Sequence, residues 1–89
     1  MQGITKSGYE YNIDDRILSD WRFTTALTKC QKTSGMDQLE GAQEMIRLMF
    51  GKDYDKFMSF IEAKNDGFVP ADVVMKEVQE IFESKIPKN

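Results

Sequence analysis

The sequence predicts a mainly α-helical protein, with an N-terminal β-hairpin followed by about four short helices packed in one compact domain. Apolar and polar residues alternate near the N-terminus, which is typical of a strand. From Asp14 onward, apolar residues recur every three or four positions, which is typical of helices, and the connections between the periodic segments are short. Because 89 residues suffice for one core, we expect a single domain over 1–89, with the hairpin at 3–13 and helical segments over 14–86.

The hairpin is predicted from two β-favouring segments on either side of a turn. Residues 9–13 (YEYNI) alternate apolar and polar side chains, and Ile4 precedes the turn at 6–8 (KSG). The glycine can supply the positive φ that tight hairpin turns require. A two-stranded hairpin alone is marginally stable in water, so its aromatic face must pack on another segment. We expect its tyrosines and Trp21 to form the contact between the hairpin and the first helix.

A single helical turn at 14–18 leads into the first long helix. Ser19 is a good N-cap residue, so we expect this helix to begin after it and to end near Gln31. The second helix is expected from about Asp37 to Phe50, with Gly51 at the position where many helices end in a left-handed residue. The apolar stripes are Phe23, Ala26, Leu27 and Cys30 in the first helix and Leu39, Ala42, Met45, Ile46, Met49 and Phe50 in the second.

Two further helices follow. The third is expected from about Asp53 to Ala63, and it ends at the turn 65–67 (NDG). Pro70 occupies the first turn of the fourth helix, where a missing N–H is tolerated, and Pro87 ends this helix near Lys85. Their apolar faces are Tyr54, Phe57, Met58 and Ile61 in the third helix and Val74, Val78, Ile81 and Phe82 in the fourth.

Composition and charge exclude several classes of partner. With 12 basic and 15 acidic residues the net charge is −3, and a chain without a basic excess is poorly suited to the phosphate backbone of a nucleic acid. No apolar run approaches the about 18 residues of a membrane span, and residues 1–6 lack the pattern of a signal peptide. We therefore expect neither a nucleic acid nor a membrane as partner.

The residue types needed for catalysis or metal binding are missing or badly spaced. The chain has no histidine, which excludes a His-based catalytic triad. Its single cysteine, Cys30, therefore has no histidine to activate its thiol as a nucleophile. Asp53 and Asp55 resemble the start of a calcium loop, but Met58 stands at the glycine position and Lys64 at the final glutamate position. We therefore expect no catalytic, cofactor-binding or metal-binding residues, and no enzymatic activity.

Methionine is frequent, with six residues in the chain. Its unbranched side chain is common on surfaces that accept variable apolar partners, although it also fills gaps in small cores. Met45 and Met49 are spaced one helical turn apart. We expect partner-binding residues at Met45, Met49, Met58 and Phe50, and gap filling is the alternative role of the methionines.

Three stretches of the sequence carry a family resemblance. They are SGYEYNIDD at 7–15 leading to DWRF at 20–23, LMFGKDY at 48–54, and NDGFVP at 65–70 leading to VQEIFE at 78–83. Together they resemble the small tail assembly chaperones of long-tailed phages and prophages of Gram-positive bacteria, and the similarity spans nearly the whole chain. Members of that family often have an acidic loop after the first helix, whereas here Lys29 and Lys32 flank it.

The resemblance implies a non-enzymatic protein of the host bacterial cytoplasm that needs no cofactor. Such chaperones bind the long, largely helical tape measure protein, keep it soluble, help tail tube subunits to polymerise around it, and are absent from the mature virion. A homo-oligomer is compatible with this role. Genes of the family often contain a ribosomal frameshift site, and residues 87–89 (PKN) can be encoded by CCA AAA AAC, which includes the slippery run A AAA AAC.

Two other functions remain open. The main alternative is a small self-associating phage protein with a structural or regulatory role. A helix-turn-helix regulator is the second, because the helices on either side of Gly51 have roughly the required arrangement. Against it, Asp53, Asp55 and Glu62 would meet DNA phosphates with the wrong charge.

Overall fold

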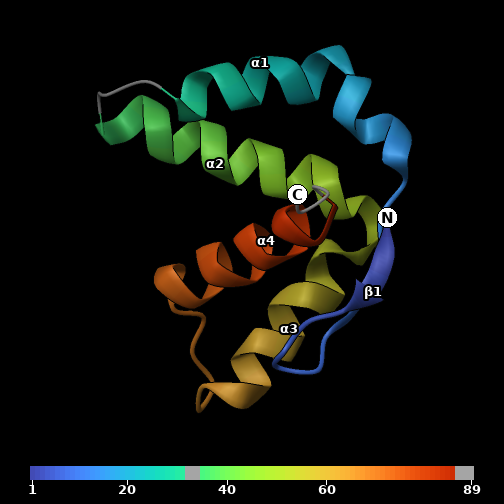
Figure 1. Cartoon of the computed structure of the whole chain (residues 1–89). Coiled ribbons are helices and arrows are strands. Elements are labelled where there is room, and N and C mark those ends of the chain that lie inside the picture. Colours follow the sequence, from blue (N-terminus) through green and yellow to red (C-terminus); the bar gives the residue numbers. More distant parts are fainter. Residues whose placement is uncertain (32–34, 86–89) are drawn as a thin grey trace. The chain divides into compact units, whose positions relative to one another are not determined.

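The computed structural model of the chain describes residues 1–31 and 35–85 (Figure 1). It is mainly helical and has a two-stranded antiparallel hairpin at the N-terminus, so the predicted fold class is confirmed. Pro87, which we expect to end the last helix, lies outside the described residues. No helix within the described ranges is long and apolar enough to cross a membrane.

The chain divides into two compact units. The first unit comprises Met1–Asn12 together with Asp55–Asn89, and the second unit is the continuous segment Ile13–Tyr54. The first unit therefore combines the two ends of the sequence, and the second is inserted between them. The single domain over 1–89 stays a prediction.

The hairpin consists of β1 (Gln2–Ile4) and β2 (Glu10–Asn12), which pair antiparallel. Thr5 closes the connection, because its N–H donates to the carbonyl of Tyr9 (2.9 Å) and its carbonyl accepts from the N–H of Gly8 (2.9 Å). Gly8 has a φ of 100°, a conformation that glycine adopts without strain. The predicted turn at these residues is confirmed, and the hairpin begins and ends one residue earlier than the predicted 3–13, at Gln2 and Asn12.

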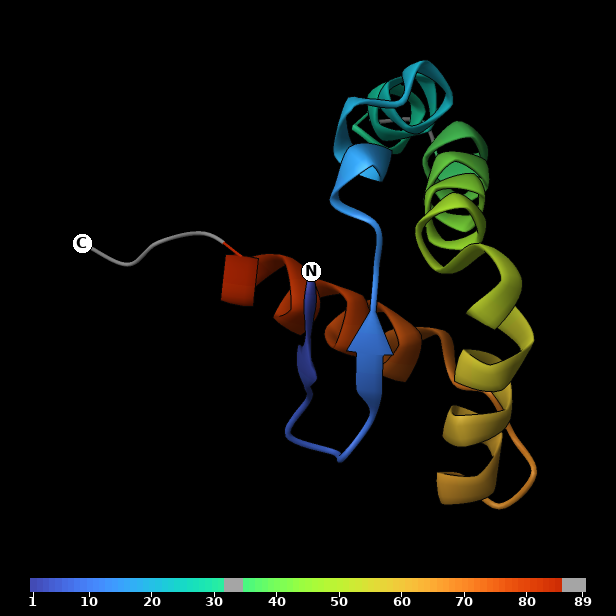
Figure 2. The ribbon, with the colours of Figure 1, turned by 90° about the vertical axis from the view of Figure 1, so that its right-hand side faces the viewer.

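The aromatic face of the hairpin packs within the first unit. The Tyr9 ring lies 5.1 Å from the ring of Phe57 and 5.1 Å from that of Phe60, both in α3 (Tyr54–Lys64). Figure 2 shows the hairpin beside α4 (Ala71–Lys85), to which its turn is hydrogen-bonded. The prediction that the hairpin needs a packing partner is confirmed. The expected contact of Trp21 with the hairpin would join the two units and stays a prediction.

The end of α3 and the start of α4 follow from local backbone chemistry. Asp66 and Gly67 both have positive φ, of 56° and 80°, and this left-handed pair ends α3 at the predicted turn. Pro70 lies just before the first residue of α4, and its carbonyl accepts the N–H of Val74 (3.1 Å). Pro70 therefore lies one position before the first turn that was predicted to contain it. No hydrogen bond within the helix requires an N–H at this position, so proline is tolerated there.

The second unit contains the short 3₁₀ helix η1 (Asp15–Ser19), α1 (Trp21–Cys30), α2 (Gly35–Phe50) and the 3₁₀ turn η2 (Gly51–Asp53). Figure 1 shows α1 and α2 side by side, running in opposite directions. The predicted helical turn after the hairpin and the two helices that follow it are confirmed. Gly51 has the predicted left-handed conformation, with a φ of 53°.

Helices α1 and α2 approach closely at Gly41. A Cβ on this residue would lie 2.5 Å from the amide nitrogen of Cys30 and 2.6 Å from the carbonyl oxygen of Ala26. Only a residue without a side chain fits such a distance. From the predicted stripes, Phe23, Ala26, Ala42, Met45, Ile46, Met49 and Phe50 are buried, whereas Leu27 and Leu39 are partly exposed.

Candidate functional site

The residues predicted to bind a partner are mostly inside the protein. Met45, Met49 and Phe50 lie on α2 with exposed fractions of 5 %, 4 % and 6 %. Met58 lies on α3, in the other unit, and is half-buried. The burial of the first three agrees with the gap-filling role of methionine. Their partner-binding role stays a prediction, because a client could reach them only if the packing around them changed.

A surface groove lies between α1 and α2, and we name it the α1–α2 groove. Its volume is about 440 Å³. It is lined by Trp21, Arg22 and Thr25 of α1 and by Glu44, Arg47 and Leu48 of α2. The indole, the leucine side chain and the aliphatic stems of the arginines give it an apolar lining with charged groups at its edge.

Trp21 is the most exposed aromatic residue in the described part of the chain, at 79 %. It is the first residue of α1 and lies one turn before Thr25, so the two share a face of the helix. Phe23 and Ala26 occupy the opposite, buried face. This phase difference was readable in the sequence, since Trp21 is out of register with the apolar stripe of the helix that it begins.

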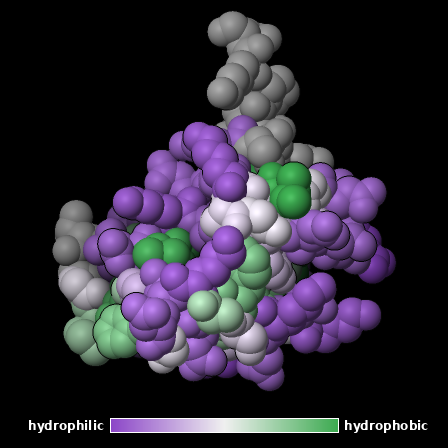
Figure 3. Space-filling view, turned by 90° about the horizontal axis from the view of Figure 1, so that it is seen from below, coloured by the Kyte–Doolittle hydropathy of each residue, from purple (hydrophilic) through white to green (hydrophobic). Residues whose placement is uncertain are grey.

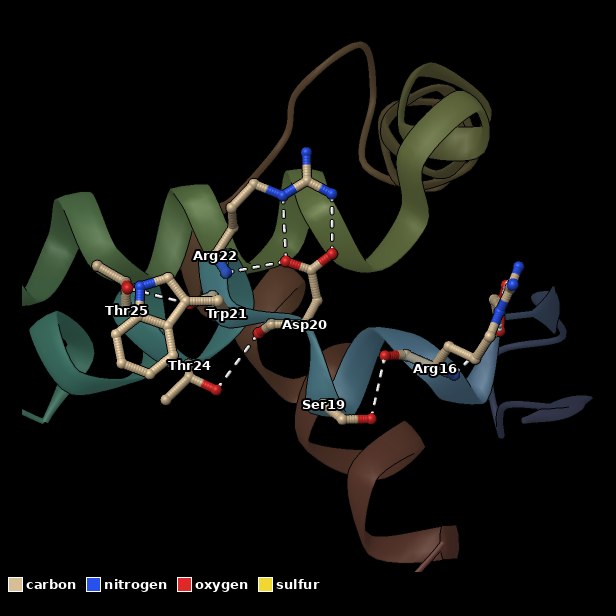
Figure 4. A network of polar contacts seen from close by, with 8 residues as sticks. Arg16, Ser19, Asp20, Trp21, Arg22, Thr24 and Thr25 are labelled. Atoms are coloured by element: carbon tan, nitrogen blue, oxygen red, sulfur yellow. Dashed lines mark hydrogen bonds and ion pairs between the residues drawn. The ribbon is translucent and has the colours of Figure 1, made fainter.

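Asp20, immediately before Trp21, fixes the start of α1. Its carboxylate accepts the backbone N–H of Arg22 (2.8 Å) and two hydrogen bonds from the guanidinium of the same residue, at 3.1 and 2.8 Å (Figure 4). The expected N-cap, Ser19, is wrong by one position, because η1 extends through Ser19, whose hydroxyl donates to the carbonyl of Arg16. Aspartate caps a helix as well as serine does, so the two neighbours could not be distinguished by residue type alone.

The hydrogen bonds around Asp20 also determine its charge. The side-chain hydrogen bond from Arg22, followed by the backbone N–H of the same residue, lowers the pKa of Asp20 to about 2. The carboxylate is therefore ionised at neutral pH and holds the Arg22 guanidinium at the edge of the α1–α2 groove.

Arg47 lines the groove from α2. Its guanidinium carbon lies 4.6 Å from the centre of the Tyr54 ring, a cation–π contact. Among the described residues, no carboxylate lies within ion-pair distance of Arg47. By contrast, Lys29 bonds to the carboxylates of Glu40 (3.2 Å) and Glu44 (3.3 Å), and these bonds raise its pKa. The guanidinium of Arg47 can therefore form an ion pair with a carboxylate of another molecule.

The described residues offer no grouping of three or more histidine, cysteine, aspartate or glutamate side chains that could hold a metal ion. Cys30 is half-buried beside the close contact of α1 with α2. The α1–α2 groove is instead built from an aromatic residue, aliphatic groups and arginines, which is the composition of protein-binding surfaces.

No family model matches the chain, and no curated protein and no solved structure matches it either.

Proposed function

We propose that this chain is a non-enzymatic tail assembly chaperone of a phage or prophage, and that it holds a helical segment of the tape measure protein in the α1–α2 groove. The observation that carries the proposal is the exposure of Trp21 beside an apolar groove between two helices. The class of client follows from the sequence resemblance. The chaperone acts in the host cytoplasm, brings the client to the tail tube protein, and leaves before the virion is complete.

A groove between two helices suits an amphipathic helix as its occupant. Such a helix places apolar side chains at intervals of three and four residues, and these side chains enter a groove lined by apolar groups. Here Trp21 and Leu48 would contact them from the two sides. One exposed aromatic anchor gives a modest affinity rather than a permanent complex, which agrees with a client that must later be released.

The charges at the groove favour particular polar residues beside the apolar face of the client helix. Arg47 has no carboxylate partner among the described residues and lines the groove from α2, whereas Trp21 lines it from α1. A client helix with a glutamate or aspartate beside its apolar face would place that carboxylate on the Arg47 guanidinium. The preferred client segment is therefore an amphipathic helix with an acidic border.

The proposal is tested by co-expression of the tagged chain with fragments of the tape measure protein encoded near it. The wild-type chain should copurify with a helical fragment and keep it soluble, and Trp21→Ala should lose most of the complex. Phe68→Ala is the matched control, because Phe68 is also a highly exposed aromatic residue (67 %) but lies in the other unit. Absence of any complex with the wild type, or equal capture by Trp21→Ala, would contradict the proposal.

Self-association is the second candidate, because an exposed tryptophan at an apolar groove can equally be covered by another copy of the chain. Size-exclusion chromatography with light scattering over a range of concentrations separates the two. A client-binding chaperone forms its complex with the tape measure fragment whatever its own state of association. A protein that only self-associates forms oligomers of higher molar mass as its concentration rises. Trp21→Ala should abolish these oligomers, and neither protein should bind the tape measure fragment.

The resemblance also includes a longer product made by frameshifting. The DNA that encodes residues 87–89 tests this part separately. A slippery A AAA AAC run followed by an overlapping open frame is the expected result. Its absence would count against frameshifting but not against binding of the client.

A further inference from the structure

A second cavity lies within the first unit, and we name it the Glu77 cavity. Its volume is about 220 Å³. It is bounded by the turn of the hairpin, the last turns of α3 and the first half of α4. The lining residues are Ser7, Phe60, Ile61, Lys64, Asn65, Val73 and Glu77.

Glu77 is a buried carboxylate with one oxygen in use and one free. Its exposed fraction is 7 %. Oε1 accepts a hydrogen bond from the hydroxyl of Ser7, whereas Oε2 is buried without a hydrogen-bond partner among the described residues. Buried carboxylate oxygens are normally satisfied by donors, because a charge without them is costly in a low-dielectric environment. The free oxygen therefore needs a donor.

The polar groups around the cavity are engaged elsewhere. The side-chain amide of Asn65 donates to the carbonyl of Ile61 (2.7 Å), and the ammonium of Lys64 lies 5.3 Å from the centre of the Phe60 ring. The neighbouring carboxylate on α4, Glu80, accepts the backbone N–H of Lys6 (2.7 Å). The donor for Oε2 of Glu77 thus has to come from a molecule that enters the cavity, or from Lys64 if it leaves the ring.

We propose that the Glu77 cavity binds a primary ammonium group carried on a short apolar stem. The ammonium would donate to Oε2 of Glu77, and the stem would lie against Phe60, Ile61 and Val73. An anion is disfavoured by the buried carboxylate, and a metal ion would lack ligands among the described residues. A water molecule could bond to the oxygen but would leave the apolar lining uncovered and the charge unpaired.

The same chemistry occurs in a free alkylamine and in the lysine side chain of a partner protein. The two sources differ because the lysine stem is attached to a peptide backbone. This backbone must remain outside the cavity when the ammonium group is bound. This inference stands independently of the proposed function, because it concerns other residues in the other unit.

Titration of the ¹⁵N-labelled full chain with butylammonium chloride, followed by NMR, tests the proposal. We expect saturable shifts of the amides around Glu77 and in the turn that contains Ser7. The matched neutral probe, 1-butanol, should bind about tenfold more weakly or not at all, because it lacks the charge. A capped lysine, with its backbone amidated and acetylated, distinguishes the two sources. Binding equal to that of butylammonium indicates a partner's lysine, and exclusion indicates a free amine.

Variants connect the binding to the named atoms. Glu77→Gln keeps an acceptor for Ser7 but removes the charge, and it should weaken butylammonium binding about tenfold. Glu83→Gln, an exposed site on the same helix, should bind like the wild type. Lys64→Gln removes the competing ammonium and should strengthen binding, which keeps the proposal testable if Glu77→Gln does not fold. Equal shifts with butanol, no saturable shift at all, or unchanged binding in both cavity variants would overturn it.

Discussion

Gly41 shows how one residue sets the distance between two helices. A Cβ at this position would lie 2.5 Å from the amide nitrogen of Cys30 and 2.7 Å from the Cβ of Lys29. Both neighbours belong to α1, and the nearer one is backbone, so neither can move without shifting the helix. The spacing of α1 and α2, and with it the width of the α1–α2 groove, depends on a glycine here.

Gly41→Ala should therefore destabilise the protein by about 1–3 kcal/mol, because an added methyl group forces the helices apart. Urea unfolding followed by circular dichroism measures this change. Gly35→Ala is the control, since a Cβ at Gly35, also in α2, would have no atom within 4 Å. The control should be neutral or slightly stabilising, because alanine favours the helix over glycine. Equal destabilisation by both variants would refute the close-contact account.

Asp20 gives a prediction about acid stability. Arg22 lowers the pKa of Asp20 to about 2 in the folded protein, against about 3.9 for an unperturbed aspartate. The group binds protons more readily when the chain unfolds, so its contribution to stability is fully present above about pH 4 and is lost as the pH falls through about 2.

Asp20→Asn keeps a capping side chain but removes this charge. The wild type should be more stable than the variant at neutral pH, and the difference should shrink as the pH falls from about 5 to about 2. Urea midpoints of both proteins over this pH range measure it. A difference that stays constant with pH would show that the charge of Asp20 does not contribute.

The turn of the β1–β2 hairpin makes hydrogen bonds beyond those of the three residue pairs in its strands. Thr5 is 5 % exposed, and its hydroxyl oxygen accepts the backbone N–H of Tyr9 (3.1 Å). Side chains on α4 then bind the turn from outside, Glu77 at the hydroxyl of Ser7 and Glu80 at the N–H of Lys6. The turn is therefore a structural connection between the hairpin and α4.

Thr5→Val keeps the shape of the side chain but removes the hydroxyl oxygen that accepts the N–H of Tyr9 in a buried hydrogen bond. We expect a loss of about 1–3 kcal/mol in the free energy of unfolding. Thr28→Val, on the exposed side of α1, should change it by less than about 0.5 kcal/mol. Chemical denaturation distinguishes the two, and a small effect of Thr5→Val would mean that the turn is not a stabilising element.

The helices and their ends were largely predictable from the sequence because the signals are local. Gly8, Gly51 and Gly67 all have the positive φ expected of glycine at a turn or helix end. The choice between Ser19 and Asp20 as N-cap was not predictable, because it depends on how far η1 extends. Whether Met45 is buried or open to a partner depends on tertiary neighbours, which a periodic pattern does not identify, whereas the position of Trp21 outside the apolar stripe of α1 is visible in the pattern.

Exposed apolar residues are present on both units of the molecule. Seen from below, one face is mainly hydrophilic, with small separate hydrophobic areas (Figure 3). Isolated exposed apolar residues of this kind are normal on a protein surface. Trp21 differs because its exposed indole adjoins a groove of about 440 Å³. The surface best suited to bind a partner therefore lies in the second unit.

Trp21 is the single tryptophan of the chain, so its fluorescence reports directly on the α1–α2 groove. In the free protein, its emission should be that of a solvated indole. Addition of a tape measure fragment without tryptophan should shift the emission to shorter wavelength as the helix covers the indole, and Phe68→Ala should behave in the same way. A complex that forms with no change in the Trp21 emission would contradict the claim that the client binds in this groove.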